Sequence, residues 1–170
     1  MTVNFPNKHF LINGEWVCSN TEIDLINPST GDVIAQVSEA NNEHVNDAVG
    51  VAKDTLENTW KNITARERST LLSTLGRLIE ENYDVLASLE ATDVGKPLRQ
   101  AQADVKALAR YMEFYAGAAD KLHGDTIPYL EDYTVYTLRE PHGVCAHIIP
   151  WNYPMQILSL IHISEPTRPT

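Results

Sequence analysis

The feature that most constrains the fold is a long middle section in which apolar residues repeat with the period of an α-helix. From Asn42 to about His123, apolar side chains recur at the three- and four-residue spacing that puts them on one helical face. Thr64 and Glu67 form a capping-box pattern at the start of one segment, and Gly95 marks the end of another. The section therefore predicts four consecutive helical segments across the middle of the chain.

Two of these segments carry clear candidate core positions. The expected buried stripe of the segment after Thr64 consists of Leu71, Leu72, Leu75, Leu78 and Ile79. In the last and longest segment, the residues at the spacing of one helical face are Val105, Leu108, Ala109, Met112, Tyr115, Ala116 and Ala119. Pro97 can open this last helix, because the first helical position does not need an amide hydrogen.

Charged residues of the helical section are expected to be structural. A solvated helix face is expected for most of the acidic residues Glu80, Glu81, Glu90 and Asp93. Lys96 follows Gly95 directly, but the glycine spacing and the serine or threonine of a phosphate-binding loop are absent. A helix stop therefore explains Lys96 better than a phosphate site.

Strand-like patterns precede the helical section. Asn13 and Gly14 stand between apolar pairs, which is a strong signal for a hairpin because both residues tolerate positive φ. Residues 22–27 and 33–37 flank a turn cluster rich in proline, serine and glycine. Two antiparallel hairpins are therefore expected before the helices.

Two further strands are expected after the helices. Residues 133–138 alternate in polarity, as one strand of a hairpin does. Residues 143–149 form a continuous apolar run, which is typical of a buried strand in a parallel sheet. Ligands of open α/β sheets bind beyond the carboxyl ends of such strands, where the loop Pro150–Pro154 would lie. Asn152 in this loop could donate its amide hydrogens to a reacting oxygen. The fold class predicted by these patterns is α/β.

Composition narrows the class of function. With 170 residues and 43% hydrophobic content, the chain can form one well-cored domain or a piece of one. A formal charge of -10 argues against a nucleic-acid or anionic-membrane surface. We find no apolar stretch of membrane-spanning length and no signal peptide, so a cytoplasmic protein is expected. Cys18 and Cys145 lack disulfide or zinc-site spacing.

Six sequence blocks, in order and at family-like spacing, resemble the NAD(P)-dependent aldehyde dehydrogenase superfamily. These blocks are Asn27–Gly31, Ala65–Arg68, Leu89–Pro97, Tyr115–Gly117, Arg139–Val144 and Pro150–Pro154. The resemblance covers residues 8–157, and residues 151–156 are similar to betaine-aldehyde-type members. It implies the N-terminal part of that fold: β-hairpins, a layer of helices, an oligomerisation strand and the first strand of a Rossmann-like sheet, cut short.

The resemblance also implies an activity and its site. The family oxidises a small aldehyde to a carboxylic acid with NAD or NADP, through a cysteine thiohemiacetal and thioester. Asn152 matches the asparagine whose side-chain amide lines the oxyanion hole. Ile149, Pro150 and Trp151, together with Asn152, match residues that line the dinucleotide pocket. Neither the aldehyde nor the choice between NAD and NADP follows from the matched blocks.

Two further roles follow from the resemblance alone. Asp93 and the main chain of Leu25 and Ile26 match positions that hold a monovalent cation, such as K+, in some members. Residues 133–138 match a strand that bridges subunits, so a homo-oligomer of undetermined size is implied for the complete protein.

Other family elements have no counterpart in this sequence. The nucleophilic cysteine, its assisting glutamate and the main phosphate-contacting loop all lie downstream of Asn152 in the family, and Cys145 does not match the nucleophile's motif. We therefore expect the chain to be inactive alone. Residues 158–170 depart from the family pattern, cannot continue a helix past Pro166, and resemble the translation of a sequencing adapter. Two alternatives to a fragment of an active enzyme remain open. The chain is either a catalytically inactive module for assembly or a shortened chain without a function of its own.

Overall fold

A computed structural model describes residues 9–158. Its helices and strands follow in the order β1 (Phe10–Ile12), β2 (Glu15–Val17), β3 (Glu22–Ile26), β4 (Val33–Ser38), α1 (Asn42–Asn58), η1 (Trp60–Asn62), α2 (Ala65–Glu81), α3 (Tyr83–Val94), α4 (Leu98–Ala118), β5 (Thr126–Ile127) and β6 (Val135–Tyr136). Residues 154–158 add a short helical segment. The predicted aberrant tail lies outside the described residues except for Leu158.

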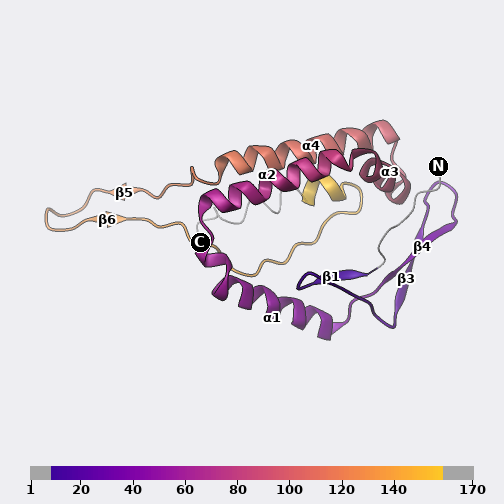
Figure 1. The fold of residues 1–170 in the computed structure, drawn as a ribbon, viewed down its shortest axis with the longest axis horizontal. Helices are drawn as coiled ribbons and strands as arrows, with labels where there is room; N and C mark the ends of the chain where they lie inside the picture. Colours follow the sequence, from indigo (N-terminus) through magenta and orange to yellow (C-terminus); the bar gives the residue numbers. More distant parts are fainter. Residues whose placement is uncertain (1–8, 159–170) are drawn as a thin grey trace.

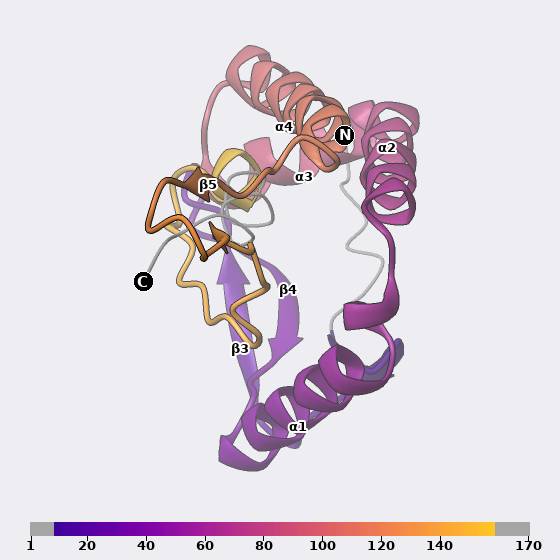
Figure 2. The ribbon, with the colours of Figure 1, turned by 90° about the vertical axis from the view of Figure 1, so that its left-hand side faces the viewer.

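Both predicted N-terminal hairpins are confirmed. Strand β1 pairs with β2 across Asn13 and Gly14, whose φ angles are 54° and 77°. Strand β3 pairs with β4, and the turn between them is closed by the Asn27 amide, which donates to the Asp32 carbonyl at 2.8 Å. In Figures 1 and 2 this second hairpin spans the distance between α1 and α3.

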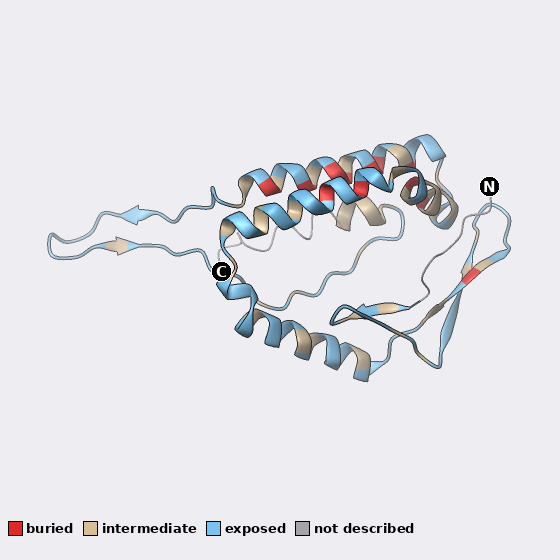
Figure 3. Ribbon diagram, viewed as in Figure 1, coloured by how far each residue is buried: buried red, intermediate tan, exposed pale blue. Residues whose placement is uncertain are grey.

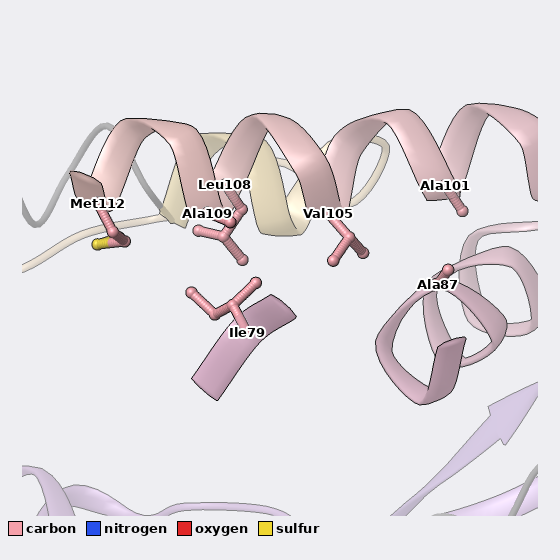
Figure 4. Packing of buried hydrophobic residues seen from close by; sticks show 7 residues of the cluster. All are labelled: Ile79, Ala87, Ala101, Val105, Leu108, Ala109 and Met112. Carbon is pink, nitrogen blue, oxygen red and sulfur yellow. The ribbon is translucent and has the colours of Figure 1, made fainter. Parts of the chain in front are cut away.

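The core lies in a layer formed by α2, α3 and α4. Helix α4 packs along α2 and also against α3, and the ribbon positions coloured as buried lie mainly along α4, with others on α2 and α3 (Figures 1 and 3). The central cluster, drawn in Figure 4, consists of Ile79, Ala87, Ala101, Val105, Leu108, Ala109 and Met112. The predicted core positions of α4 are thus largely confirmed, with Tyr115 and Ala119 only half-buried.

The predicted core positions of α2 are partly wrong. Ile79 is buried and Leu72 is half-buried, but Leu71, Leu75 and Leu78 are 52%, 41% and 44% exposed. Helix α2 turns one side toward α4, and these three leucines lie on a second side that no described element covers. Helix α1 likewise has an apolar face but no buried residue.

Gly95 ends α3 in the left-handed conformation, with φ 75° and ψ 20°. A Cβ atom at this position would lie 2.5 Å from Cγ of Pro28 in the β3–β4 turn. Gly95 therefore serves both as the predicted helix stop and as a close contact between α3 and the second hairpin.

Replacing Gly95 with alanine is expected to destabilise the chain by about 1 to 2 kcal/mol from the backbone conformation, with a further cost from the contact with Pro28. Gly50 in α1 provides a matched control, because its φ is not positive and a Cβ there would meet nothing within 4 Å. Gly50→Ala should instead stabilise the helix by about 0.5 to 1 kcal/mol. Urea unfolding of both variants tests whether the free energy of unfolding falls for Gly95→Ala and rises for Gly50→Ala. Equal changes in the free energy of unfolding for the two variants would contradict the left-handed conformation and the close Pro28 contact assigned to Gly95.

Helix α4 ends at Ala118, earlier than the predicted end near His123. Gly117 lies in its last turn and weakens the helix, and the Lys121 amide then donates to the Ala118 carbonyl in a tighter turn. Beyond it, β5 and β6 form an arm that extends away from the helical layer (Figure 1). Of the predicted strand 133–138, residues 135–136 form the ladder with β5, and the Thr137 amide also donates to the Asp125 carbonyl at 2.9 Å.

The predicted buried strand at residues 143–149 is not formed. No strand is assigned to residues 141–150, Val144 is 40% exposed, and Ile148 is fully exposed. A parallel strand needs a neighbour in the same sheet, and the described chain contains only two-stranded antiparallel sheets. The segment instead starts beside α1, where Gly143 approaches Leu56, and leads to the loop at residue 150.

None of the helices between residues 9 and 158 has the length and apolar character needed to cross a membrane.

Candidate active-site loop and the buried ion pairs behind it

The Pro150–Pro154 loop forms a turn at the start of the short helical segment. The Tyr153 amide donates to the Pro150 carbonyl at 3.4 Å, and the Ile157 amide donates to the Tyr153 carbonyl at 3.1 Å. The turn places Trp151 and Asn152 outward, and the Trp151 side chain is 79% exposed. Both predicted site residues therefore lie at the tip of the loop.

Asn152 is exposed, and its side-chain amide makes no hydrogen bond to any residue of the described range. An amide group of this kind offers two donors and one acceptor. Because residues 9–158 do not use its donors, Asn152 can present them to a substrate oxygen.

The predicted dinucleotide-contacting residues are consecutive but only partly sheltered. Ile149 is half-buried, whereas Pro150 and Trp151 are exposed. They fit one apolar wall against which a flat ring could lie, because an indole and a proline ring offer broad apolar faces. A hollow between α2, α3 and α4 is lined by Glu80, Tyr83, Lys106 and neighbouring side chains, and it does not include these three residues.

Behind the loop, a lysine is held between two buried carboxylates. The Lys96 ammonium donates to Glu90 Oε1 at 2.5 Å and to Asp104 Oδ2 at 2.8 Å. The side chains of Lys96, Glu90 and Asp104 are 9%, 0% and 5% exposed. Glu90 comes from α3 and Asp104 from α4, so the ion pairs join the two helices through the lysine between them.

Burial shapes the protonation of this group. Burial raises the pKa of Glu90, and the hydrogen bond from Lys96 offsets only part of that effect. The second oxygen, Glu90 Oε2, is buried without a hydrogen-bond partner in the described part of the chain. Burial alone would lower the pKa of Lys96, but hydrogen bonds to Asp104 and Glu90 outweigh it and the pKa is raised. The fold therefore stabilises the charged form of the lysine.

Sequence reasoning missed this group. A solvated face was expected for most of the acidic helix residues, and Glu90 is an exception, because it is 3% exposed. A usable sequence signal was present, because Glu90 lies four residues after the apolar Leu86 and hence on the same side of α3. Gly95 does end the helix as predicted, but Lys96 has a structural role of its own in addition.

The ion pairs reach the loop through Tyr153. The Lys96 ammonium lies 4.4 Å from the centroid of the Tyr153 ring, within the range of a cation–π contact. Met155, two residues further on, packs against the core cluster of the helical layer. The loop is thus fastened to the helices immediately after Asn152.

The predicted cation-binding segments are brought near one another. The contact between Gly95 and Pro28 joins the end of α3, which carries Asp93, to the turn that follows Ile26. The ladder between β3 and β4 is irregular between Leu25 and Ile26, and such a bulge leaves main-chain groups without a ladder partner. Asp93 is exposed. Carbonyl and carboxylate oxygens of this kind suit a hard cation, although no cluster of three or more His, Cys, Asp or Glu side chains occurs in residues 9–158.

Solved structures resemble this chain closely. A putative aldehyde dehydrogenase from Burkholderia cenocepacia matches 89% of the chain with a TM-score of 0.86 and 49% identity, and the match covers 32% of that protein. A double mutant of betaine aldehyde dehydrogenase from Staphylococcus aureus, in complex with NAD+, matches 96% of the chain with a TM-score of 0.90 and 32% identity, and the match covers 34% of that protein. The described fold is thus a mixed helix and strand portion of those larger structures.

Sequence comparison agrees. Rat mitochondrial aldehyde dehydrogenase is 43% identical over 156 residues, and Arabidopsis thaliana aldehyde dehydrogenase family 2 member B4, mitochondrial, is 42% identical over 158 residues. The chain spans 30% and 29% of the lengths of these two relatives. A sequence model described as the aldehyde dehydrogenase family matches residues 16–163, and the boundary expected after residue 157 stays a prediction. This chain belongs to the aldehyde dehydrogenase family.

Proposed function

We propose that the chain supplies the Asn152 side of the active site of an NAD(P)-dependent aldehyde dehydrogenase. The observation that carries the proposal is the Pro150–Pro154 loop. In this loop Asn152 is exposed, its amide donates to no residue of the described chain, and the residues that follow are fastened to the helical layer. Its reaction would be the oxidation of a small aldehyde to a carboxylic acid in the complete protein.

Asn152 would act as a hydrogen-bond donor in this reaction. Negative charge develops on the aldehyde oxygen when a nucleophile attacks the carbonyl carbon, and a preorganised amide stabilises that charge. One such donor contributes about 3 to 4 kcal/mol to the lowering of the barrier. Asn152 holds no proton that it must transfer, so its contribution depends on its position.

Ile149, Pro150 and Trp151 would form one apolar wall of the dinucleotide site. When bound, NAD or NADP supplies the hydride acceptor. The proposal includes both cofactors, because matched structures include one in complex with NAD+ and an NADP-dependent enzyme from E. coli. The wall would exclude water from one side of the reacting carbon.

We extend the proposal to a cation site, an assembly surface and a compartment. Asp93 with the main chain of Leu25 and Ile26 would hold a monovalent cation such as K+. The β5–β6 arm would join subunits of a homo-oligomer, because large side chains on it are exposed: Tyr129, Leu130, Tyr133, Tyr136 and Leu138 are 61 to 71% exposed. A cytoplasmic location stays a prediction, and several matched relatives are mitochondrial by name.

The activity is tested by product analysis on the complete protein. Incubation with NAD and a small aldehyde should yield the corresponding carboxylic acid, detected by mass spectrometry, together with an equal amount of NADH. Omitting either reactant should abolish both products. Failure to form the acid with a range of aliphatic and aromatic aldehydes and both cofactors would contradict the proposal.

A second candidate function is an assembly module without catalysis, which the exposed β5–β6 arm favours. A complete protein that forms oligomers but neither binds NAD nor oxidises aldehydes would support it.

A further inference from the structure

The Lys96 ammonium is placed between the helical layer and the loop that carries Asn152. On one side it contacts Glu90 Oε1 and Asp104 Oδ2, at 2.5 and 2.8 Å. On the other side it lies 4.4 Å from the centre of the Tyr153 ring. The lysine therefore connects the helices to the residue that directly follows Asn152.

The helical side of this connection is rigid for a physical reason. The two carboxylates come from α3 and α4 and are almost fully buried, so water cannot replace them as partners of the ammonium. Gln100 Nε2 also donates to Asp104 Oδ1, at 3.4 Å, which fixes the orientation of that carboxylate. The position of the charge is thus set by the packing of the two helices.

The loop is held to the helical layer at its C-terminal end. A cation over a partly desolvated aromatic face is attracted more strongly than one at an exposed face. Tyr153 is half-buried, and Met155 packs on the core cluster, whereas Trp151 on the other side of Asn152 is exposed. The contact with Lys96 therefore restrains Tyr153, the residue next to Asn152, relative to the helical layer.

We propose that Lys96, held by Glu90 and Asp104, is a positioning residue that fixes the Asn152 amide by contacting the ring of Tyr153. The inference rests on the proposed role of Asn152 in aldehyde oxidation. A shift of about 1 Å in a catalytic group can cost about 100-fold in rate, so a restraint next to Asn152 matters for turnover. Ground-state binding of NAD, which depends on the apolar wall, should change little.

The test uses variants of the complete protein that spare the buried ion pairs. Tyr153→Leu removes the aromatic face and is expected to lower kcat about tenfold while KM for NAD stays within about twofold. Tyr153→Phe retains the ring face, so its kcat should be at least half that of the unmodified protein. The matched control is Tyr83→Leu, which removes the ring of the other cation–π pair, with Lys106 5.6 Å from that ring's centroid. This control should lose stability but keep kcat.

A double-mutant cycle then links the ring to the lysine. Lys96→Met lowers kcat by itself if the protein folds, and adding Tyr153→Leu to it should cost less than twofold more, because the shared contact is already lost. If the double variant loses kcat by the product of the two single losses, the proposal is overturned. An unchanged kcat in folded Tyr153→Leu would also overturn it. If Lys96→Met does not fold, the Tyr153 and Tyr83 variants decide the matter alone.

The proposed role of Asn152 is checked separately with Asn152→Ala. If Asn152→Ala keeps full kcat, the proposed function of the loop fails, whatever Tyr153→Leu does. If Asn152→Ala loses kcat and Tyr153→Leu does not, only the positioning role of Lys96 fails.

Discussion

Asn152→Ala is expected to lower kcat of the complete protein by about 100- to 1,000-fold, the effect of removing one preorganised donor to a developing oxyanion. The reason is that the alanine methyl group cannot donate a hydrogen bond where the negative charge forms. KM for NAD should change far less, because the apolar wall of Ile149, Pro150 and Trp151 remains. Steady-state kinetics with saturating aldehyde measures the effect.

Asn46→Ala is a suitable control for this variant. Asn46 is an exposed asparagine within α1, away from the loop, so its loss removes an amide of the same kind without touching the site. It should leave kcat unchanged. An Asn152→Ala enzyme with kcat within twofold of the unmodified protein would show that the amide does not stabilise the transition state.

Lys96→Met is expected to lower the free energy of unfolding of the chain by about 3 to 5 kcal/mol, the effect of removing one partner from a buried ion pair. Methionine fills a similar volume but leaves Glu90 and Asp104 buried without their counter-charge. Because burial raises the pKa of Glu90, part of the loss should be recovered at acidic pH, where this carboxyl takes up a proton. Urea unfolding at neutral and acidic pH measures both effects.

The control is Lys61→Met, which removes an ion pair of nearly the same length. Lys61 and Glu57 are 2.7 Å apart, but their side chains are 52% and 66% exposed. Solvent screens such a pair, so its loss should cost far less than that of Lys96. Equal losses in the two variants would mean that burial of the Lys96 group contributes nothing to its strength.

Local signals in the sequence were sufficient to predict much of the secondary structure. Asn13 and Gly14 could be placed in a turn because few residues tolerate positive φ. The capping box at Thr64 is also formed as predicted, with the Glu67 amide donating to Thr64 Oγ1 at 3.2 Å and the Thr64 amide donating to Glu67 Oε2 at 2.8 Å. Such features are decided within a few residues of chain.

Features that depend on distant partners were harder to predict. The apolar run at residues 143–149 has the composition of a buried strand, but a strand exists only when another strand pairs with it. Leu71, Leu75 and Leu78 are apolar as a core requires, yet no described element packs on them. Their pattern indicates which surfaces are suited to burial and does not determine what covers them.

The buried ion pairs illustrate the same limit for the candidate site. Asn152 was found from a motif of consecutive residues, which sequence reasoning handles well. The contacts of Lys96 join residues from two helices and a loop, with Tyr153 lying more than fifty positions along the chain. Helical spacing from the apolar Leu86 could have placed Glu90 on the buried side, but only the packing of α3 against α4 brings Asp104 to the same lysine.

The central claim is that this chain carries one side of an aldehyde dehydrogenase active site. It is tested most directly by measuring NADH absorbance for the complete protein and for the 170-residue chain, side by side at equal molar concentration with NAD and aldehyde. The account predicts aldehyde-dependent NADH formation by the complete protein and none by the chain alone. NADH formation by the chain alone, or its absence in the complete protein, would contradict the account.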